Sequence, residues 1–348
     1  MPSTFEEVRL SKNSEIQGNG RRNVKRTVTM ADIADALGIA KITVSRALSS
    51  DSVVKESTRE RVREAAERMG YRLNVSARNL RQQRSQTIAV VIEMAPSHDR
   101  SMREPYPLSL LGGIMQELTS ASYNMILTTI DLFASAPPSV DGVILLGQGV
   151  HEDAMDIVQR TGLPYITWGA LDGNKAHVTV GSDNLDGGRT AGDYLLRRGG
   201  RRFVFLGNTG HREISDRETG FAKRLSEAGI ALWKSLSCAF TVEGGHRAMQ
   251  DAIASSDGPI DGVFCANDAI AMGAIHALRE ANFEVPSDTS VVGFDDSPGA
   301  AFFHPPLTSI GQNWDEGGVL LARKIIGLTA GRVERSFVMP IRLEERST

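Results

Sequence analysis

Residues 29–48, TMADIADALGIAKITVSRAL, decide the first part of the fold. Thr29 is a good N-cap for a helix over Met30–Leu37, and Gly38 suits the left-handed residue that ends such a helix. A second helix over about Lys41–Leu48 follows at once, and two helices joined by a tight glycine turn have the spacing of a helix-turn-helix unit. The spacing alone leaves open a small helical adaptor with no nucleic-acid role.

Around this unit the sequence divides into segments of different amino-acid composition. Residues 1–26 are polar, charged and short of large apolar groups, so we expect a disordered arm. A third helix over 57–69 completes an all-α helix-turn-helix domain over 27–73. The polar, basic segment 74–86 is expected to be a linker, and 87–348 a separate core.

Charge is unevenly distributed between the amino-terminal part and the core. Residues 1–86 hold 17 Lys and Arg against 10 Asp and Glu, a balance of +7, whereas the rest of the 348-residue chain carries −10, which gives −3 in total. A basic head on an acidic core suggests that only the head meets a polyanion. On charge alone, a solvated charged surface is an equal alternative.

Short apolar runs alternate with amphipathic helical segments throughout the core. Such runs are typical of parallel strands buried on both faces, and about 260 residues exceed what one sheet needs. We therefore expect an α/β core of two doubly wound parallel-sheet lobes, with a ligand site in the cleft between them. The expected N-lobe spans about 87–198 and 312–330, and the expected C-lobe about 199–311 and 331–348.

Composition disfavours several other classes of protein. The chain has no run of 18 apolar residues, and its amino-terminal segment lacks the apolar centre of a signal peptide, so we expect a cytoplasmic protein without a membrane span. Cys238 and Cys265 lie far apart and the seven histidines are scattered, so we expect no disulfide framework, metal site or cofactor. No GxSxG elbow, Walker loop or catalytic Cys-His spacing is present that would indicate an enzyme.

Several sequence motifs follow one another along the chain in the order in which a known protein family carries them. The segments TVSRAL at 43–48, TRERVREAAERMGY at 58–71 and NVSARNL at 74–80 resemble the head of the LacI/GalR family of bacterial regulators, and the similarity continues to about residue 343. The resemblance implies a periplasmic-binding-protein-like core, a homodimer, a pseudopalindromic operator in double-stranded DNA and a small-molecule effector that changes the affinity for it. The direction of that change, and repression as against activation, are left open.

By this resemblance, the second helix reads DNA in the major groove. Arg46 can donate two hydrogen bonds to guanine, Lys41 can contact guanine or a phosphate, and Ile42 can contact a thymine methyl. Ala40 stands where the family usually has a Ser or Thr cap, and Leu73 where it usually has Pro. The positions assigned to DNA in the head are Thr29, Lys41, Ile42, Thr43, Ser45 and Arg46.

The linker is the second DNA contact that the resemblance implies. Asn74 can cap a short helix over 75–80, which is marginal on its own in water. In the family, two such helices pair over the minor groove and a leucine that matches Leu80 wedges into a base step. Ordinary interdomain packing of Leu80 is the alternative. The linker positions assigned to DNA are Asn74, Ala77, Arg78 and Leu80.

In the core, the segments VVGFDDSP, FCANDAIAMGAI, SDRETGF, DNLDGG and AFTVEGG resemble the ligand-contacting segments of the family. Asp268, in the second of these, is expected to cap a helix rather than to contact a ligand. A polar ring with one aromatic face suits a sugar or sugar derivative, because hydroxyls both donate and accept hydrogen bonds. The implied effector positions are Tyr106, Asp186, Arg217, Phe240, Asn267 and Asp295.

Two further core segments bear on the N-lobe. Between Thr129 and Val140 the chain has only IDLFASAPPS where the family usually has a longer helix-bearing segment, so a helix is expected to be missing or short. PYPLSLLGGIMQEL at 105–118 matches a core helix that commonly lies at the dimer interface. A solute-binding receptor is a second interpretation of the two lobes, which the helix-turn-helix disfavours. Turnover of a bound sugar would instead favour an enzyme.

Overall fold

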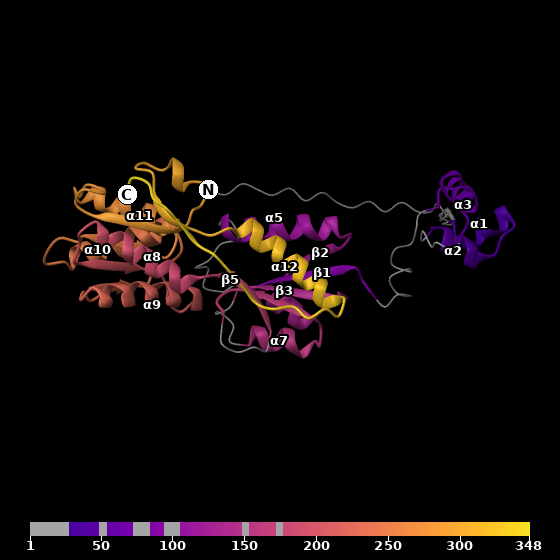
Figure 1. The fold of residues 1–348 in the computed structure, drawn as a ribbon, viewed down its shortest axis with the longest axis horizontal. Helices are drawn as coiled ribbons and strands as arrows, with labels where there is room; N and C mark the ends of the chain where they lie inside the picture. The colour runs from indigo at the N-terminus through magenta and orange to yellow at the C-terminus, as the bar shows by residue number, and fades with distance from the viewer. Residues whose placement is uncertain (1–27, 49–53, 72–83, 94–104, 148–152, 172–176) are drawn as a thin grey trace, which may run out of the picture. The chain divides into compact units, whose positions relative to one another are not determined.

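The computed structural model of the chain describes residues 28–48, 54–71, 84–93, 105–147, 153–171 and 177–348 (Figure 1). The chain divides into two compact units, Met1–Arg78 and Asn79–Thr348. The arm expected over 1–26 and the linker positions Asn74, Ala77, Arg78 and Leu80 lie outside the described residues. Within the described part of the chain, no helix combines the length and the apolar character needed to cross a membrane.

The described part of the amino-terminal unit folds into α1 (Met30–Leu37), α2 (Lys41–Leu48) and α3 (Glu56–Arg68). Thr29 caps α1 reciprocally with Asp32: its backbone N–H donates to the Asp32 carboxylate at 2.7 Å, and the N–H of Asp32 donates to the Thr29 hydroxyl at 3.4 Å. Gly38 ends α1 with a φ of 65°, which a residue with a Cβ rarely adopts. The first two helices expected from the sequence are confirmed, and the third starts one residue earlier than expected.

The first lobe of the core is built on a six-stranded sheet with the order β11-β5-β4-β3-β1-β2. All neighbouring strands in it are parallel. Every residue of β1 and β3 is buried, as expected for strands that are covered on both faces. The strands are β1 (Thr87–Ile92), β2 (Asn124–Thr129), β3 (Gly142–Leu146), β4 (Tyr165–Trp168), β5 (Val178–Ser182) and β11 (Phe337–Met339).

The second lobe has a six-stranded sheet with the order β12-β10-β9-β8-β6-β7. Its strands are parallel except for β12, which pairs antiparallel with β10. The expected fold class, a helical head and two doubly wound lobes, is confirmed. The strands are β6 (Phe203–Leu206), β7 (Lys234–Leu236), β8 (Gly262–Cys265), β9 (Ser290–Asp295), β10 (Thr308–Gly311) and β12 (Arg342–Glu344).

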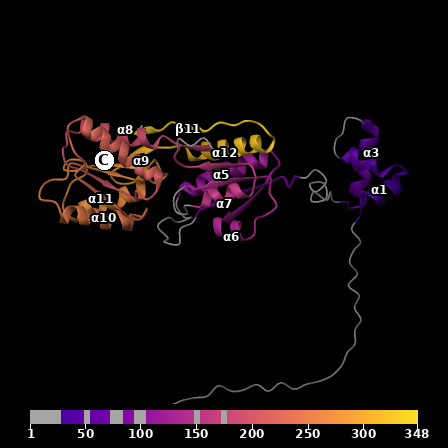
Figure 2. The ribbon, with the colours of Figure 1, turned by 90° about the horizontal axis from the view of Figure 1, so that it is seen from below.

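Helices pack on these sheets in pairs. α5 and α12 lie side by side on the first lobe in both views, and α8 pairs with α9 and α10 with α11 on the second (Figures 1 and 2). The helices of the first lobe are α5 (Pro105–Ser120), α6 (Ile130–Ser135), α7 (Ala154–Arg160) and α12 (Trp314–Thr329). Those of the second are α8 (Asn184–Arg197), α9 (Arg212–Glu227), α10 (Val242–Ala254), α11 (Asp268–Glu280) and the short 3-10 helix η1 (Ala300–Phe302).

The chain passes between the lobes at three places within residues 177–348: between β5 and α8, between β10 and α12, and between β11 and β12. These crossings correct the lobe boundaries expected from the sequence. The segment 184–197, expected in the N-lobe, belongs to the second lobe, because α8 packs against α9. The segment 337–339, expected in the C-lobe, belongs to the first lobe, because β11 pairs with β5.

The N-lobe helix that the sequence predicted to be missing or short is α6, with six residues. It follows directly on β2, an edge strand whose side chains are only partly buried or exposed. Ile126 and Leu127 are 37% and 49% exposed, and Leu132 of α6 is 63% exposed. The outer side of this lobe therefore presents apolar side chains that the described part of the chain does not cover.

Candidate functional site

A cavity lies where the carboxyl ends of strands from both sheets approach each other, as expected for open α/β sheets. It encloses about 450 Å³ of space not filled by atoms, part of it continuous with solvent. Both lobes contribute, through strand ends, helix starts and the segment that links β10 to α12. The lining residues are Tyr106, Trp168, Gly169, Ser182, Asn184, Glu213, Arg217, Phe240, Asn267, Asp295 and Gln312.

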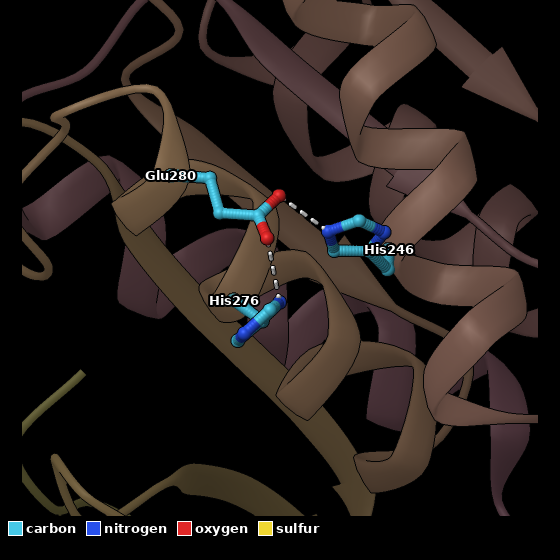
Figure 3. A group of neighbouring side chains, drawn as sticks. All are labelled: His246, His276 and Glu280. Atoms are coloured by element: carbon cyan, nitrogen blue, oxygen red, sulfur yellow. Dashed lines mark hydrogen bonds and ion pairs between the residues drawn. The ribbon is translucent and has the colours of Figure 1, made fainter.

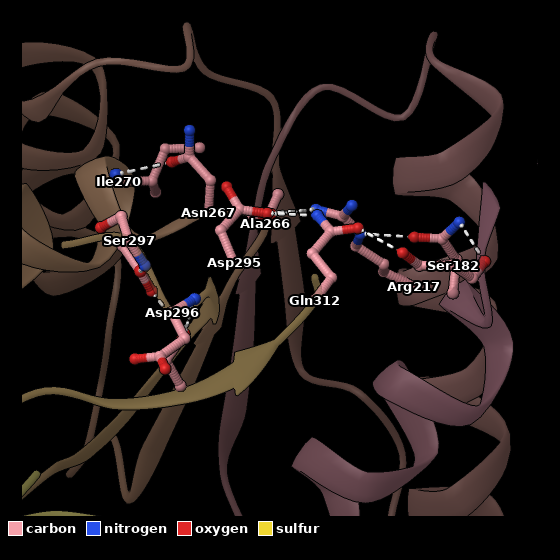
Figure 4. Close-up of polar contacts among 12 residues, drawn as sticks. Ser182, Arg217, Ala266, Asn267, Ile270, Asp295, Asp296, Ser297 and Gln312 are labelled. Carbon is pink, nitrogen blue, oxygen red and sulfur yellow. Dashed lines mark hydrogen bonds and ion pairs between the residues drawn. The ribbon is translucent and has the colours of Figure 1, made fainter. Parts of the chain in front are cut away.

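Arg217 of α9 is the buried cation of this cavity and is only 6% exposed. Its Nε donates to Oδ1 of Asn184 at 2.9 Å and its Nη1 donates to the carbonyl of Ala266 at 2.5 Å (Figure 4). The guanidinium lies over the ring of Phe294, 3.6 Å from its centroid, and its Nη1 is 3.9 Å from a carboxylate oxygen of Asp295. These contacts fix a permanently charged planar group, which suits hydroxyl, carboxylate or phosphate groups of a ligand.

α8 and α9 can hold Arg217 in this position because their backbones touch. A Cβ added at Gly188 of α8 would lie 1.9 Å from the carbonyl oxygen of Arg217, and one added at Gly220 of α9 would lie 2.0 Å from the carbonyl oxygen of Leu185. No side chain fits at either place. The close helix contact brings Asn184, at the start of α8, within hydrogen-bonding distance of the Arg217 guanidinium.

Gln312 connects the two lobes across the cavity (Figure 4). Ser182, which ends β5 of the first sheet, donates from its hydroxyl to Oε1 of Gln312 at 2.5 Å. The Nε2 of Gln312 in turn donates to Oδ1 of Asp295, which ends β9 of the second sheet, at 2.6 Å. Asp295 has a φ of 109°, a backbone conformation that costs a non-glycine residue about 1–3 kcal/mol and is found mostly at binding sites.

Asn267 lines the cavity and is also the N-cap of α11. Its Oδ1 accepts from the backbone N–H of Ile270 at 2.8 Å, so its amide NH₂ is the group left to donate to a ligand. The expectation that Asp268 caps this helix is wrong. Asp268 is 2% exposed and instead accepts from the hydroxyl of Ser309 and the backbone N–H of Ser297, both at 2.6 Å. Burial raises the pKa of Asp268 to about 6.

Aromatic side chains form the apolar part of the wall. Phe240 is 2% exposed and meets the ring of His211 edge to face, with 5.3 Å between centroids. Tyr106 of α5 meets Trp314 of α12 in the same way at 5.7 Å. Of these aromatic residues, Phe240 and Tyr106 line the cavity together with Trp168, and they offer surfaces against which an apolar ligand face can pack, while the polar groups fix its orientation.

Five of the six core positions expected at the ligand reach the cavity: Tyr106, Arg217, Phe240, Asn267 and Asp295. The sixth, Asp186, does not line it and is exposed in the first turn of α8. Because successive helical residues are turned by about 100°, Asp186 points about 200° away from Asn184, which takes the inward position. The sequence reasoning missed Asn184, Ser182 and Gln312, although Ser182 ends β5, Gln312 directly follows β10 and Asn184 begins α8.

A wider hollow adjoins the cavity and shares Asp295 and Gln312 with it. It encloses about 1200 Å³ of space not filled by atoms, open solvent included. Its lining includes Trp314 and Arg342, which lie beside the crossings between the lobes. Gln312 therefore lies at the boundary between the two spaces.

In the head, α2 presents the positions expected to read DNA. Val44 and Ala47 are fully buried against the other helices, whereas Lys41, Ile42 and Arg46 are exposed. Ile42 is 60% exposed, a large apolar side chain on the solvent side of an otherwise polar helix face. Of the remaining expected positions, Thr29 is exposed and Thr43 and Ser45 are partly buried. At the start of α2, the backbone carbonyl of Ala40 accepts from the N–H groups of Thr43 and Val44.

The helix-turn-helix unit and the two-lobed core with its cavity define a class of two-part proteins, in which a DNA-binding fold is joined to a small-molecule-binding fold. Residues 29–74 match the family described as bacterial regulatory proteins, lacI family, and residues 193–348 match the periplasmic binding protein-like domain. The HTH-type transcriptional regulator RegA of Clostridium saccharobutylicum is 30% identical over 92% of this chain and 98% of its own length. The chain belongs to the lacI family of bacterial regulatory proteins.

Other similar proteins agree with this membership. The HTH-type transcriptional regulator CelR of Thermobifida fusca is 29% identical over 92% of this chain and 96% of its own. A lac repressor dimer bound to operator and the anti-inducer ONPF superposes with a TM-score of 0.82, at 23% identity over 93% of this chain and 99% of that one. A CelR–cellobiose complex has a TM-score of 0.70, at 26% identity over 92% and 99%. The family to which the chain belongs consists of transcriptional regulators, not enzymes.

Proposed function

We propose that the protein is a sequence-specific DNA-binding repressor whose affinity for its operator is controlled by a sugar or sugar derivative bound in the cavity. The observation that carries this proposal is the Ser182–Gln312–Asp295 connection, because it joins the two lobes at the cavity. A ligand that bonds to these three side chains changes how the lobes are held together. A ligand acts on a conformational equilibrium only through such differential contacts.

The DNA-binding part of the proposal rests on α2. Arg46 supplies the bidentate donor for guanine, and Ile42, which is 60% exposed, supplies an apolar contact. Lys41 completes an exposed base-reading edge at the start of the helix. Thr29 and Thr43 are proposed to contact phosphates, which would fix the register of the head on the duplex, and Ser45 is proposed as a further DNA contact. The linker contacts by Asn74, Ala77, Arg78 and Leu80 are proposed from the family resemblance alone.

The ligand class follows from the chemistry of the cavity wall. Arg217 and the Asn267 amide donate, the Asp295 carboxylate accepts, and Phe240 offers an aromatic face. Sugars present hydroxyls that donate and accept, and C–H faces that pack on aromatic rings. The related CelR has been solved with cellobiose, which makes cellobiose one member of the panel to be tested here.

The active species is proposed to be a homodimer in the bacterial cytoplasm, where the operator is found. α5 carries Leu108 and Met115 seven residues apart on one face, and they are 53% and 58% exposed. Two such apolar side chains on one helical face suit contact with a second copy. Two-fold symmetry in turn predicts a pseudopalindromic operator.

Selection of bound duplexes from random DNA by the full chain tests the proposal. Repeating the selection with cellobiose, other mono- and oligosaccharides, nucleosides and amino acids identifies the effector and the sign of its action. We expect one pseudopalindromic sequence, and a sugar that changes the affinity for it. A chain with no preference among duplexes at any salt concentration contradicts the DNA-binding assignment, and a response only to nucleosides or amino acids contradicts the sugar.

A further inference from the structure

Two histidines that lie 30 residues apart in the sequence meet one carboxylate on the second lobe (Figure 3). His246 of α10 approaches Glu280 of α11 with 2.7 Å between Nε2 and Oε2. His276, one helical turn before Glu280, approaches the other carboxylate oxygen with 3.5 Å between Nδ1 and Oε1. The ligand atoms of all three side chains lie within 4.8 Å of one another. This cluster, His246–His276–Glu280, takes no part in the cavity or in the DNA-reading face.

The geometry points to a binding site for Zn²⁺, or a divalent transition ion of similar preference, held by the three side chains of this cluster. Two imidazole nitrogens and one carboxylate oxygen are a donor set that such ions favour, whereas Mg²⁺ and Ca²⁺ favour oxygen alone. With bonds of about 2.0–2.1 Å, tetrahedral ligand atoms lie about 3.3 Å apart. The ligand atoms lie within 4.8 Å of one another, so side-chain rotations can bring them onto one ion.

The backbone beneath the cluster is fixed, which makes the arrangement reproducible. A Cβ at Gly273 of α11 would lie 2.0 Å from the carbonyl oxygen of Val242 and 2.7 Å from the backbone nitrogen of His246. A Cβ at Gly245 of α10 would lie 2.2 Å from the carbonyl oxygen of Ile270. The two helices are therefore in direct backbone contact beside His246. The framework that carries the three ligands costs little to order when an ion binds.

The surroundings leave room for a fourth ligand. The side chains of His276 and Glu280 are 64% and 49% exposed, and that of His246 is 23% exposed. Solvent therefore reaches the place where an ion would lie, and a water can complete the coordination, as in zinc sites with three protein ligands. The two imidazole rings are 5.1 Å apart between centroids and inclined by 47°, so both can turn a nitrogen toward a common point. Gln250 donates to Oε2 of Glu280 at 3.4 Å and helps to orient the carboxylate.

An ion at this cluster joins two helices that each begin at the cavity. Thr241, directly after Phe240, caps α10, and Asn267 caps α11. The ion fastens the first half of α10 to the last turns of α11. It thereby stabilises the second lobe against unfolding, because a ligand that binds only the folded state raises its stability.

The test is calorimetric titration of Zn²⁺ into the full chain, purified without a polyhistidine tag and stripped with a chelator, with Mg²⁺ as the comparison ion. We expect one Zn²⁺ per chain, no heat from Mg²⁺, and a higher unfolding temperature with Zn²⁺. His246→Ala, His276→Ala and Glu280→Gln should each weaken Zn²⁺ binding at least about tenfold. His304→Ala, at an exposed histidine outside the cluster, should bind as the wild type does.

Further measurements distinguish loss of the metal site from loss of the fold, and failure of this proposal from failure of the proposed function. Unfolding temperatures of the metal-free variants report any loss of fold, and visible absorption of bound Co²⁺ reports four-coordinate geometry. Arg217→Met should keep full Zn²⁺ affinity, so failure of the sugar proposal leaves this one intact. Absence of Zn²⁺ binding by the wild type, or wild-type affinity in both histidine variants, overturns the assignment and leaves the cluster as an interhelical hydrogen bond.

Discussion

Nε2 of Gln312 lies 2.6 Å from Oδ1 of Asp295, and this single hydrogen bond joins the segment between the lobes to the carboxylate that ends a central strand of the second sheet. A hydrogen bond to a charged group contributes about 1.5–3 kcal/mol. Asp295 also lies near the Arg217 guanidinium, so Gln312 helps to hold one member of the buried ion pair. The relative position of the lobes is thus linked to the charged part of the cavity.

Gln312→Ala is expected to loosen the lobes and to weaken effector binding. It removes both the acceptor for Ser182 and the donor for Asp295. We expect the affinity for the effector to fall about tenfold to a hundredfold, which corresponds to roughly 1.5–3 kcal/mol. Calorimetry measures the affinity, and small-angle scattering measures whether the core opens. Gln159→Ala, at an exposed position on α7, is the matched control, and an equal loss in both variants would contradict the role of Gln312.

Arg217→Met should separate sensing from DNA binding. The substitution keeps the length of the side chain but removes the guanidinium that Asn184 and the Ala266 carbonyl hold in place. We expect operator binding to persist and the response to the effector to disappear, with a stability loss of about 1–3 kcal/mol for each partner left unsatisfied. Operator affinity with and without effector is the measurement. Arg212→Met, on the same helix but exposed, should show the wild-type change in operator affinity when the effector is added. The same change in Arg217→Met would show that Arg217 does not contact the effector.

Arg46→Ala should relax sequence preference rather than simply weaken DNA binding. Losing a bidentate contact to guanine costs about 1–3 kcal/mol at one base pair of each half-site. Binding to non-specific DNA should change far less. Arg63→Ala, at an exposed arginine of α3, is the control, because any phosphate contact there would lower affinity uniformly across sequences. Unchanged base preference in Arg46→Ala, measured by quantitative selection, would show that another residue reads that base.

Asp268→Asn should flatten the pH dependence of stability. The pKa of Asp268 is raised from its usual value of 3.8 to about 6 by burial, so the folded state binds the proton more tightly than the unfolded state does. Its contribution to stability is therefore fully present below about pH 3.8 and is lost as pH rises through about 6, by roughly 3 kcal/mol in all.

Denaturant unfolding gives the free energy of unfolding of the wild type and of Asp268→Asn at several pH values between 4 and 7. The effect is the difference between the slopes of the two plots of this free energy against pH. The asparagine keeps one acceptor for Ser309 or the Ser297 N–H, so part of the local structure persists. Asp251→Asn, at an exposed position, should retain the wild-type slope. Parallel curves for the wild type and Asp268→Asn would mean that burial of this carboxyl does not control its protonation.

The parts of the fold that were predictable are those fixed by local chemistry. Thr29 and Gly38 set both ends of the first helix through a side-chain cap and a left-handed residue, neither of which needs tertiary information. Short runs of apolar residues likewise predicted the buried strands. The lobe boundaries were not predictable in this way, because β11 has only three residues and its sheet membership depends on pairing with β5, some 155 residues earlier.

Single residues of the cavity were likewise predictable from the sequence only where tertiary packing does not decide their role. Arg217 and Asp295 could be assigned from their motifs, but the choice between Asn184 and Asp186 depends on which face of α8 turns inward. Asn267 rather than Asp268 caps α11 for a similar reason, since both can cap a helix and only Asp268 accepts from the hydroxyl of Ser309. The scattered histidines gave no reason to expect a metal site, because contact between α10 and α11 is what brings two of them together.

Each sheet takes an edge strand from the same short stretch, since β11 ends at Met339 and β12 begins at Arg342. During synthesis, neither lobe can complete its sheet before this stretch has left the ribosome. The two sheets are therefore completed together, although their other strands are synthesised at different times. A premature stop ahead of Phe337 would remove an edge strand from both sheets at once. Nonsense mutations late in the gene should therefore abolish both halves of the sensor, not only the one nearer to the lesion.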